Sequence, residues 1–429
     1  MKGKYKFLLT FLIISISGFV ITAQNDLMDR SNQHYTTNVS SFLVSLEYWN
    51  EEITKSVGDW PNSVFIGDAN NDGQNDIVTA NQRDHVVSIL LWNINSGDWD
   101  SQITKPAGGD PFSVFIGDAN NDEQNDIITV NPFSNEVSIL LWNMTAGDWD
   151  LKITRPVGRN PYTVFIGDAN NDGQHDIVTA NFVDDNVSIL LWNSTAGDWD
   201  PQITRFLGNG AESVFIADAN NDGQNDIVTA NRIVDDVSIL LWNTTASDWD
   251  PQITRTVRDN PYTIFIGDAN NDGQNDIVTA NRWNDTISIL LWNTTACDWN
   301  SQIVRVVGNA PFSVFIGDVN NDEQNDIVTA NNDANNISIL LWNTTAGDWD
   351  SQITRSVGNA PRSVFIGDAN NDGLNDLVTA NEADDNVSIL LAFSPEQQPI
   401  SGFELFFALI GIIAMTIIYL RKKNFFKMF

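Results

Sequence analysis

One segment repeats through most of this chain at a spacing of 50 residues. The segment that begins at Val64, with the sequence VFIGDANNDG, recurs nearly unchanged. Its seven copies begin at Val64, Val114, Val164, Val214, Ile264, Val314 and Val364. A period of this size is typical of solenoids and propellers, in which each unit buries its apolar face against a neighbour. Length alone suggests about three domains, but the repeat indicates one continuous array.

Each unit has the pattern of four short strands. In the third copy, residues 164–167 and 176–180 are rich in β-branched side chains and flank a turn of Asp, Asn and Gly. Residues 187–192 form a third run, and residues 202–207 form a fourth after the turn at 196–198. We therefore expect an all-β fold, a seven-bladed β-propeller of four-stranded antiparallel blades.

The two ends of the array predict a ring closed by an N-terminal strand. The seventh copy stops at Leu391-Ala392, after its third strand. The missing strand is present before the first copy, where Trp49 and residues 53–55 precede Trp99 and residues 103–105 by 50 positions. Such a closure removes the strand edges that an open array exposes. The tryptophans that recur in every unit are expected in the core between blades.

The segments outside the array carry targeting patterns. Lys2, Lys4 and Lys6 precede an apolar run and a plausible cleavage site at Ile21-Thr22-Ala23, which is typical of a secretory signal. The apolar C-terminal segment is followed by Arg421, Lys422 and further cations, which predicts a membrane span with a cytoplasmic end. We expect a cell-surface protein with its propeller outside. The expected domains are a signal peptide (1–23), an N-terminal lead (24–37), the propeller (38–392), a linker (393–402), a transmembrane helix (403–420) and a basic tail (421–429).

Both ends allow other interpretations. An uncleaved membrane anchor is the alternative to the signal peptide. The C-terminal segment also resembles the tripartite sorting signals of some prokaryotic surface proteins, in which the helix is removed; a buried core helix is a third interpretation. Sequons such as Asn143, Asn193 and Asn243 are consistent with a glycoprotein, although duplication of one unit also copies a chance sequon.

Each copy carries the pattern Asp-x-Asn-x-Asp-Gly-x-x-Asp, or a close variant, between its first two strands. Alternate residues on such a loop direct oxygen atoms to one centre, and Ca²⁺ binds about six to eight oxygens, whereas Mg²⁺ keeps more water. The carboxylates of one loop would repel one another strongly if the loop held no ion. This repulsion favours a cation-binding loop over an ordinary Asp/Gly-rich turn. We expect up to seven Ca²⁺ ions, one per blade. The expected ligands, with the seventh loop position acting through its carbonyl, are Asp68, Asn70, Asp72, Gln74 and Asp76; Asp118, Asn120, Asp122, Gln124 and Asp126; Asp168, Asn170, Asp172, Gln174 and Asp176; Asp218, Asn220, Asp222, Gln224 and Asp226; Asp268, Asn270, Asp272, Gln274 and Asp276; Asp318, Asn320, Asp322, Gln324 and Asp326; and Asp368, Asn370, Asp372, Leu374 and Asp376.

Two loops depart from this pattern. Glu123 and Glu323 replace the loop glycine, so a residue with a side chain must adopt that backbone conformation. We expect these two sites to be weaker, or the glutamate to add an outer contact.

The run from Phe215 to Asn231 (FIADANNDGQNDIVTAN), followed by VSILL at 237–241, resembles an FG-GAP/VCBS repeat. That family is similar to the propeller of integrin α chains and includes calcium-binding lectins. The resemblance covers about residues 38–392 and implies a propeller with Ca²⁺ in the loop between the first two strands of each blade. The chain departs from the family by using Asn at the third loop position, where Asp is frequent, and Trp after the third strand, where the family often turns through Gly.

The connections at the opposite end of each blade, between strands two and three and between strands four and one, vary from copy to copy. Aromatic and arginine side chains on a rigid rim can stack on sugars or anchor a protein, although unconstrained surface loops also vary. The candidates for a ligand face are Trp60, Arg83, Phe112, Arg159, Tyr162, Arg258, Tyr262, Trp283, Phe312 and Arg362.

These features predict a non-catalytic, calcium-binding surface propeller that mediates adhesion to, or recognition of, an extracellular protein or glycan. The formal charge of −34 excludes nucleic-acid binding through a basic surface, and one cysteine excludes an internal disulfide framework. The alternatives are a propeller lyase acting on polysaccharide and a structural coat protein. We do not expect an enzyme, because no unique cluster of His, Lys, Tyr or Ser interrupts the repeat.

Overall fold

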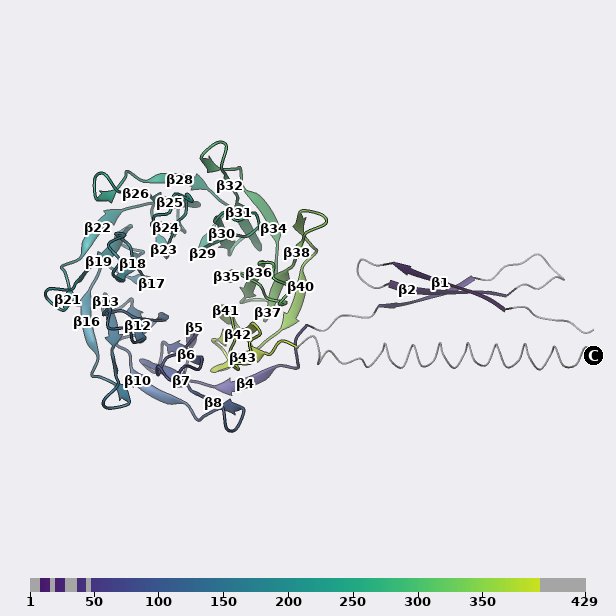
Figure 1. Ribbon diagram of the computed structural model, residues 1–429, viewed down its shortest axis with the longest axis horizontal. Helices are drawn as coiled ribbons and strands as arrows, with labels where there is room; N and C mark the ends of the chain where they lie inside the picture. Colours follow the sequence, from purple (N-terminus) through teal and green to yellow (C-terminus); the bar gives the residue numbers. More distant parts are fainter. Residues whose placement is uncertain (1–7, 16–19, 28–36, 44–47, 394–429) are drawn as a thin grey trace, which may run out of the picture. The chain divides into compact units, whose positions relative to one another are not determined.

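The computed structural model describes residues 8–15, 20–27, 37–43 and 48–393. One compact unit spans Trp49–Ala392 and consists of seven four-stranded antiparallel sheets arranged as a ring (Figure 1). The predicted seven-bladed β-propeller is therefore confirmed.

The blades share one strand order, from the innermost strand at the central channel to the outermost at the perimeter. The first strands are β5 (Pro61–Gly67), β11 (Ser113–Gly117), β17 (Pro161–Gly167), β23 (Ala211–Ala217), β29 (Pro261–Gly267), β35 (Pro311–Gly317) and β41 (Pro361–Gly367). The second strands are β6 (Asp76–Asn81), β12 (Asp126–Asn131), β18 (Asp176–Asn181), β24 (Asp226–Asn231), β30 (Asp276–Asn281), β36 (Asp326–Asn331) and β42 (Asp376–Asn381). The third strands are β7 (Val86–Leu90), β13 (Glu136–Leu140), β19 (Asn186–Leu190), β25 (Asp236–Leu240), β31 (Thr286–Leu290), β37 (Asn336–Leu340) and β43 (Asn386–Leu390). The fourth strands are β10 (Ile103–Pro106), β16 (Ile153–Pro156), β22 (Ile203–Phe206), β28 (Ile253–Thr256), β34 (Ile303–Val306), β40 (Ile353–Ser356) and β4 (Ile53–Ser56).

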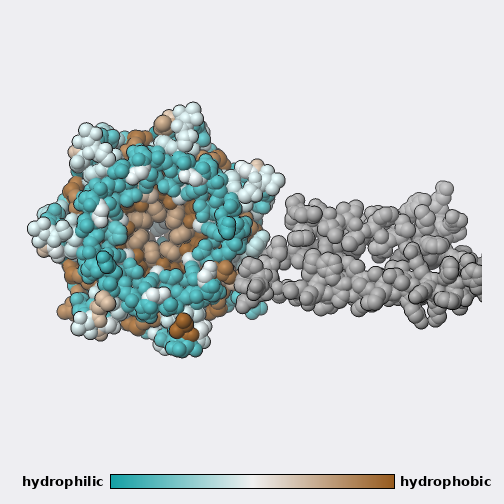
Figure 2. All heavy atoms as spheres, viewed as in Figure 1, coloured by the Kyte–Doolittle hydropathy of each residue, from teal (hydrophilic) through white to brown (hydrophobic). Residues whose placement is uncertain are grey.

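The burial of each strand follows its place in the blade. Every residue of the second strands is buried, because both of their faces pack against other blades, whereas the fourth strands mostly alternate between half-buried and exposed side chains. A phenylalanine from each first strand lines the channel, and neighbouring rings lie 4.3–4.8 Å apart around a closed circle of seven. Figure 2 shows hydrophobic residues at the centre of the ring, surrounded by a hydrophilic band.

The ring closes through the N-terminal strand, as the sequence predicts. Strand β4 pairs with β43, with Ile53 opposite Ile389 and Lys55 opposite Val387. Trp49 adds an isolated bridge to Ala392. The last blade is thus built from both ends of the array, and its outer edge is covered.

The buried tryptophans lie between blades, which confirms their predicted role. Trp99 is 6% exposed and belongs to a cluster with Val64 and Leu90 of its own blade and Val378 and Ile389 of the preceding blade. The same arrangement recurs around the ring. Six of these buried tryptophans also make an edge contact with a second Trp, as in the pair Trp92–Trp99 with centroids 4.8 Å apart.

Within the described residues, six of the seven blades carry a small two-stranded ribbon that the sequence interpretation missed. The sequence pattern predicts a third strand that continues to Trp192, but β19 ends at Leu190, and the backbone N–H of Trp192 donates to the carboxylate of Asp176 instead of pairing in the blade. The chain then forms a separate ribbon, and Figure 1 shows these ribbons projecting from the perimeter. The ribbons pair β8 (Trp92–Asn93) with β9 (Asp98–Trp99), β14 (Trp142–Asn143) with β15 (Asp148–Trp149), β20 (Trp192–Asn193) with β21 (Asp198–Trp199), β26 (Trp242–Asn243) with β27 (Asp248–Trp249), β32 (Trp292–Asn293) with β33 (Asp298–Trp299), and β38 (Trp342–Asn343) with β39 (Asp348–Trp349).

Residues before the propeller form a separate antiparallel sheet in the order β1 (Leu8–Ser15), β2 (Val20–Leu27) and β3 (Thr37–Leu43). The predicted signal peptide at 1–23 overlaps β1 and β2 and stays a prediction. Among the described residues there is no helix of the length and apolar character that a membrane span requires. The expected transmembrane helix at 403–420 and the basic tail at 421–429 lie outside the described residues.

Candidate functional site

One position in each blade breaks the repeat and points toward the channel. In six blades this position is the extra residue of a β-bulge near the start of the first strand, as at Tyr162 between Pro161 and Thr163. A bulge re-aims a side chain. The residues at this position around the ring are Asn62, Phe112, Tyr162, Glu212, Tyr262, Phe312 and Arg362.

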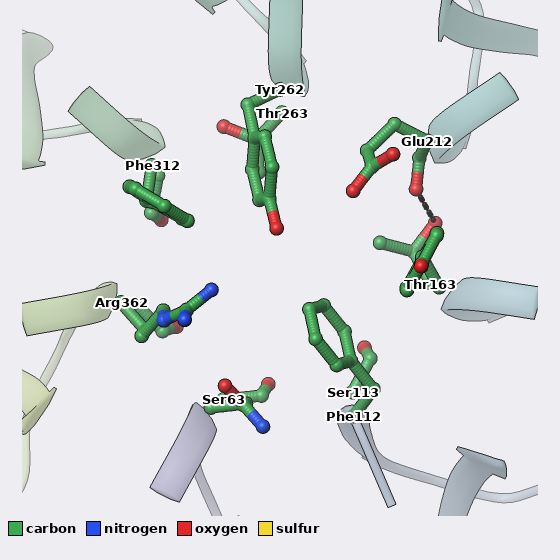
Figure 3. A pocket seen from close by; sticks show the side chains of 13 residues that line it. Ser63, Phe112, Ser113, Thr163, Glu212, Tyr262, Thr263, Phe312 and Arg362 are labelled. Carbon is green, nitrogen blue, oxygen red and sulfur yellow. Dashed lines mark hydrogen bonds between the residues drawn. The ribbon is translucent and has the colours of Figure 1, made fainter. Parts of the chain in front are cut away.

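These side chains surround a cavity of about 130 Å³, which we call the pore mouth. Figure 3 shows Phe112, Glu212, Tyr262, Phe312 and Arg362 arranged around the shared space. The remaining lining residues are Ser63, Ser113, Thr163, Thr263, Ser313 and Ser363, together with Asn62 and Tyr162. The Ser and Thr residues of the repeat are nearly the same in every blade, whereas the variable position gives the cavity its charged and aromatic side chains.

Glu212 is the most unusual member of the pore mouth. It is 1% exposed, and its Oε2 atom lies 3.3 Å from Nη1 of Arg232. Among the described residues, no donor meets Oε2 in hydrogen-bonding geometry. Burial raises the pKa of the Glu212 carboxyl to about 7, against the opposing effects of Arg232, the Tyr262 hydroxyl, Arg282 and Arg362.

Arginine and aromatic side chains alternate along one side of the pore mouth. The guanidinium of Arg232 lies 4.4 Å from the ring of Phe182 and 5.7 Å from that of Tyr262. Arg282 continues the series at 4.3 Å from Phe312. Such stacking holds a guanidinium plane in place and leaves its edge available for hydrogen bonds.

Arg362 ends this series. Its guanidinium lies 4.6 Å from the Phe312 ring and makes two hydrogen bonds to Glu382, of 2.6 and 2.9 Å. Burial works against its charge, but Glu382 and the Tyr262 phenol raise the pKa of Arg362 overall. Arg362 is therefore a fixed cation at the cavity wall.

Hydroxyl groups form the next layer of the pore mouth. The Ser63 Oγ accepts the backbone N–H of Val114 in the following blade at 3.3 Å, and Thr263 accepts that of Val314 at 3.1 Å. A hydroxyl has one proton and two lone pairs, so each of these groups can still both donate and accept one further hydrogen bond. The Thr163 hydroxyl donates to the backbone carbonyl of Glu212.

The loops that join strands two and three surround this site. Hydrogen bonds such as Gln82 N–H to the carbonyl of Trp60 hold them against the connections between strands four and one. We call this end of the blades the mouth face. Four consecutive blades place an exposed apolar side chain at the same loop position, and we call this set the apolar arc. It comprises Phe133 (73% exposed), Val183 (41%), Ile233 (59%) and Trp283 (72%).

Five of the ten predicted ligand-face residues line the pore mouth, namely Phe112, Tyr162, Tyr262, Phe312 and Arg362. The other five lie around it. Arg83 stacks on Trp60 at 3.4 Å, and Arg159 pairs with Asp184 at 2.6 Å. Arg258 and Trp283 are exposed.

The sequence interpretation did not include Glu212, Arg232 or Arg282 among the candidates. Comparison of the seven copies at the position of Glu212 could have found it, because an acid stands there among four aromatic residues. In six blades the side chain is part of a β-bulge, which has no clear sequence signal, and Phe112 lines the cavity without one.

The predicted metal loops lie at the opposite end of the blades, which we call the loop face. In the first loop, Asp68 accepts the backbone N–H groups of Asp72 at 3.0 Å and Gly73 at 2.8 Å. Asp72 accepts the N–H of Gln74, and Asn70 accepts that of Asp72. Glu123 and Glu323 adopt φ of 69° and 68°, the left-handed region that the glycines occupy in the other loops, as expected.

The last acid of each loop is buried and joins two parts of the blade. Asp76 is 0% exposed; its Oδ2 accepts the N–H of Ala69 and its Oδ1 that of Trp92. Burial raises the pKa of Asp76 to about 7, and the charges of Asp72 and Asp68 raise it further against the two backbone donors. A nearby cation would relieve this cost of ionisation.

Neighbouring loops are hydrogen-bonded to one another around the whole ring. Asn71 donates to the carbonyl of Asn125 and accepts its N–H at 2.7 Å, while the Asn125 side chain donates to the carbonyl of Asp68. His175 replaces the asparagine once, and its ring nitrogen lies 2.9 Å from the carbonyl of Asp118. The seven loops therefore form one continuous hydrogen-bonded circle.

The donor set of the loops fits a hard cation. Each carboxylate oxygen of Asp68 and Asp72 accepts one hydrogen bond, which leaves a second lone pair on each. Within the described ranges, however, no three His, Cys, Asp or Glu side chains already form a metal-binding cluster. The loops are held by their own hydrogen bonds, and the ligands would have to draw together around an ion.

Comparison with protein families gives a match to the model described as FG-GAP-like repeat. It covers residues 68–129, 168–229, 218–279, 268–329 and 318–379, which is more than half of the chain. No curated protein matches the chain significantly.

Several solved structures share the fold. BBS1N, solved in complex with ARL6DN, has a TM-score of 0.59 at 11% identity, covering 82% of this chain and 99% of that one. Kuenenia stuttgartiensis hydrazine synthase has a TM-score of 0.54 at 12% identity, covering 79% and 97%. A putative 6-phosphogluconolactonase from Bacteroides fragilis has a TM-score of 0.53 at 15% identity, covering 83% and 97%. At these identities the likeness shows the fold alone.

Proposed function

This chain belongs to the FG-GAP-like repeat family, and from that premise we propose that it is a non-catalytic recognition propeller. Its mouth face binds a protein ligand, and its loop face carries stabilising Ca²⁺ ions. The propeller presents the ligand-binding groups on a rigid ring, so little conformational entropy is lost on binding.

The observation that carries this proposal is the apolar arc beside the pore mouth. Trp283 and Phe133 are each more than 70% exposed, and the arc runs through four consecutive blades without a polar interruption at that loop position. Exposed apolar side chains grouped beside polar and charged groups mark protein interaction sites. The corresponding residues of the other three blades are Arg83, Asp333 and Ala383, so the arc is one-sided.

A structural neighbour supports protein binding as a use of this fold. BBS1N is a propeller of similar architecture that was solved in complex with ARL6DN. Neither partner is implied for this chain; the neighbour supports only the class of ligand.

We propose that Ca²⁺ occupies the loops of the seven blades. Asp68, Asn70, Asp72 and Asp76, with the carbonyl of Gln74, would hold the ion of the first loop, and the equivalent residues would hold the others. A bound cation supplies positive charge that offsets the repulsion among these acids. The chain's own hydrogen bonds already orient the loop backbone. We assign the ion a structural role, in which it stabilises the loop rather than taking part in catalysis.

Site-specific photo-crosslinking tests the recognition surface. A photoreactive amino acid is placed at Ile233 or Trp283 in the apolar arc, and at Leu151 as the control, which is 94% exposed but lies outside the mouth face. Cells that express each variant are irradiated, and the crosslinked protein is identified by mass spectrometry. We expect one defined protein to be captured from the arc positions only.

The captured protein is then purified, and its affinity is measured for Ile233→Ser, Trp283→Ser and the control Leu151→Ser. Loss of an exposed apolar anchor should weaken binding by roughly tenfold or more, with no change in the control. Equal capture from Leu151, or unchanged affinity of both arc variants, contradicts the proposal.

A polysaccharide-active enzyme is the second candidate, favoured by one observation. The buried Glu212 carboxyl, whose pKa is raised to about 7, has the character of a general acid. Incubation with polygalacturonate and detection of unsaturated products separates the two candidates: recognition predicts no product, and product that disappears in Glu212→Gln supports the enzyme.

We further propose that the propeller is displayed at the cell surface, with residues 1–23 as signal and 403–420 as the membrane anchor. The positions of the basic residues at both ends support this orientation. Surface biotinylation of intact cells should label the propeller, and deletion of 403–429 should release it into the medium. A propeller that is protected from labelling in intact cells contradicts this placement.

A further inference from the structure

We propose that the pore mouth binds a primary carboxamide, supplied by a glutamine or asparagine side chain of the protein that docks on the mouth face. This inference rests on the proposed recognition function and assigns the ligand chemistry of its central site. The evidence is two buried acceptors without donors, the balance of charge, the lining hydroxyls and the size of the cavity.

Two side chains that line the pore mouth each carry a buried oxygen without a hydrogen-bond donor. Asn62 is 6% exposed and Glu212 1%, and no described residue donates to Oδ1 of Asn62 or to Oε2 of Glu212. A buried acceptor that stays unmet costs free energy. A ligand that brings N–H donors into the cavity can remove this cost at both residues.

Both side chains are held in place by neighbouring residues. The amide nitrogen of Asn62 donates to Oε1 of Gln82 at 2.9 Å, which leaves the amide oxygen without a partner. Nη1 of Arg232 lies 3.4 Å from Oε1 of Glu212, and Figure 3 shows the Glu212 carboxylate turned toward the shared space. The two acceptors are therefore positioned before a ligand arrives.

The charges of the site are already matched, which disfavours a charged ligand. Among the described lining residues, Arg362 is the one cation, and it donates two hydrogen bonds to Glu382. Glu212 is the one acid among them, and it pairs with Arg232. An ammonium group would add a buried charge that no further acid matches. A carboxylate would also add a charge, and it brings no donor for the two unmet oxygens.

The lining hydroxyls suit a group that both donates and accepts. The oxygens of Ser63, Thr263 and Ser313 each accept one backbone N–H of the following blade, and each hydroxyl keeps a proton and a second lone pair. A primary amide matches this surface, because its nitrogen has two N–H donors and its oxygen accepts. A lone hydroxyl group has one proton and can meet only one of the two buried acceptors.

The cavity is small and has aromatic walls. Phe112 packs against Tyr162 with ring centroids 4.9 Å apart, Tyr262 packs against Phe312 at 4.5 Å, and all four rings line the cavity. The volume of about 130 Å³ is below the ~300–1,000 Å³ of pockets for small organic ligands. This size favours one side chain, whose methylene groups contact the rings, over a whole sugar. The apolar arc on the same face provides the surface for the rest of the protein.

The probe is propionamide, which is the side chain of glutamine without its backbone. Its binding to the purified full-length protein is followed by saturation-transfer NMR at pH 8.5. At this pH the Glu212 carboxyl, whose pKa burial raises to about 7, is ionised and accepts hydrogen bonds. Three further probes separate the alternatives: N,N-dimethylpropionamide lacks the N–H donors, propylammonium is a cation, and glucose is a sugar.

Asn62→Leu is the main variant, because it removes one acceptor and leaves the pair of Glu212 and Arg232 intact. Glu212→Met removes the other acceptor. The control is Asn332→Leu, which makes the same change at an asparagine whose amide nitrogen is buried without a partner but which does not line the cavity. A cooperative thermal unfolding transition shows that each variant is folded.

We expect propionamide to bind and its dimethyl analogue not to bind. Asn62→Leu and Glu212→Met should each weaken propionamide binding by roughly fivefold or more, and Asn332→Leu should leave it unchanged. Should Glu212→Met fail to fold, Asn62→Leu and the dimethyl analogue still decide the outcome.

Absence of propionamide binding overturns the inference, because solvent alone then meets the two acceptors. Equal binding of the dimethyl analogue, or an equal loss in Asn332→Leu, overturns it as well. Binding of propylammonium or glucose without propionamide overturns the assignment to a carboxamide. Failure here with arc-specific crosslinking intact removes the carboxamide pocket but leaves the recognition function. Failure of the crosslinking with propionamide binding intact removes the docking protein instead.

Discussion

At the scale of single residues, the chemical variety of this propeller is concentrated where the repeat is broken. Around the ring the bulged position carries amide, aromatic, acidic and basic side chains in turn, while the flanking Ser or Thr and Val or Ile hardly change. Glu212 shows the consequence: burial of an acid costs free energy unless the acid is paired, and such perturbed groups are concentrated at functional sites.

The titration of Glu212 makes a measurable contribution to stability. Its pKa is 4.5 in the absence of perturbation and about 7 in the folded chain. The folded state therefore retains a proton that the unfolded state loses between these values, and stability falls as the pH rises from about 4.5 to 7. Above pH 7 the stability lost through this difference in pKa amounts to about 3 kcal/mol.

Glu212→Gln should remove this pH-dependent loss of stability, because the amide does not titrate. The free energy of unfolding of the variant relative to the wild type should increase between pH 4.5 and 7, by up to about 3 kcal/mol. Denaturant unfolding of both proteins at four pH values measures the difference between their free energies of unfolding. The contributions of the other acids are the same in both proteins and cancel in this difference. A difference that is constant with pH contradicts a raised pKa for Glu212.

At the scale of elements, the loops act as links between blades as well as candidate metal sites. Asn221 adopts φ of 58° and exchanges two hydrogen bonds with the backbone of Asn275 in the next blade, of 3.1 and 2.7 Å. Asparagine tolerates the left-handed region better than most residues. The same residue thus satisfies the turn and joins two blades.

Two substitutions separate these roles. Asn221→Gly keeps the backbone conformation but loses both hydrogen bonds, and should destabilise by about 2 kcal/mol. Asn221→Ala loses the same bonds and adds the strain of a positive φ, about 1 kcal/mol more. Thermal unfolding of both variants measures the contribution of the two hydrogen bonds and that of the backbone strain. Equal stability of Asn221→Gly and the wild type would show that the hydrogen bonds between the blades contribute nothing.

At the scale of the whole molecule, the closed ring depends on strand β4. Trp49 is 2% exposed and β4 covers the outer edge of β43, so the last blade is incomplete without the N-terminal segment. Because every blade packs on two neighbours, the opening of one blade exposes two interfaces.

A chain that starts at Val57 should unfold at a temperature lower by roughly 10 °C or more, since it loses a buried Trp and a strand pairing. The matched control is a permutant in which residues 49–56 follow Ala392 through a short linker. We expect the permutant to recover most of the stability. Calorimetry of both chains tests this, and a truncated chain as stable as the original would show that β4 does not close the ring.

The sequence predicted the architecture well because the 50-residue period carries it. The blades, the closure by residues 53–55 and the buried tryptophans followed from comparing copies. The ribbons did not, because they depend on Asp176 accepting the N–H of Trp192. Half of the ligand-face candidates line the pore mouth, but Glu212 reaches it only through the bulge, which the sequence pattern does not reveal. Arg282 stacks on Phe312 of the cavity wall, a contact between neighbouring blades that no local pattern predicts.

We propose that Ca²⁺ ions fill the acidic loops, so that the linked loops make the ring a rigid platform. The most direct test is calorimetric unfolding of the purified propeller with excess Ca²⁺ and with chelator, together with the bound calcium content. We expect Ca²⁺ to raise the melting temperature by roughly 10 °C or more, and chelation to reverse this rise. An identical melting temperature in both conditions, with no calcium bound, would contradict it.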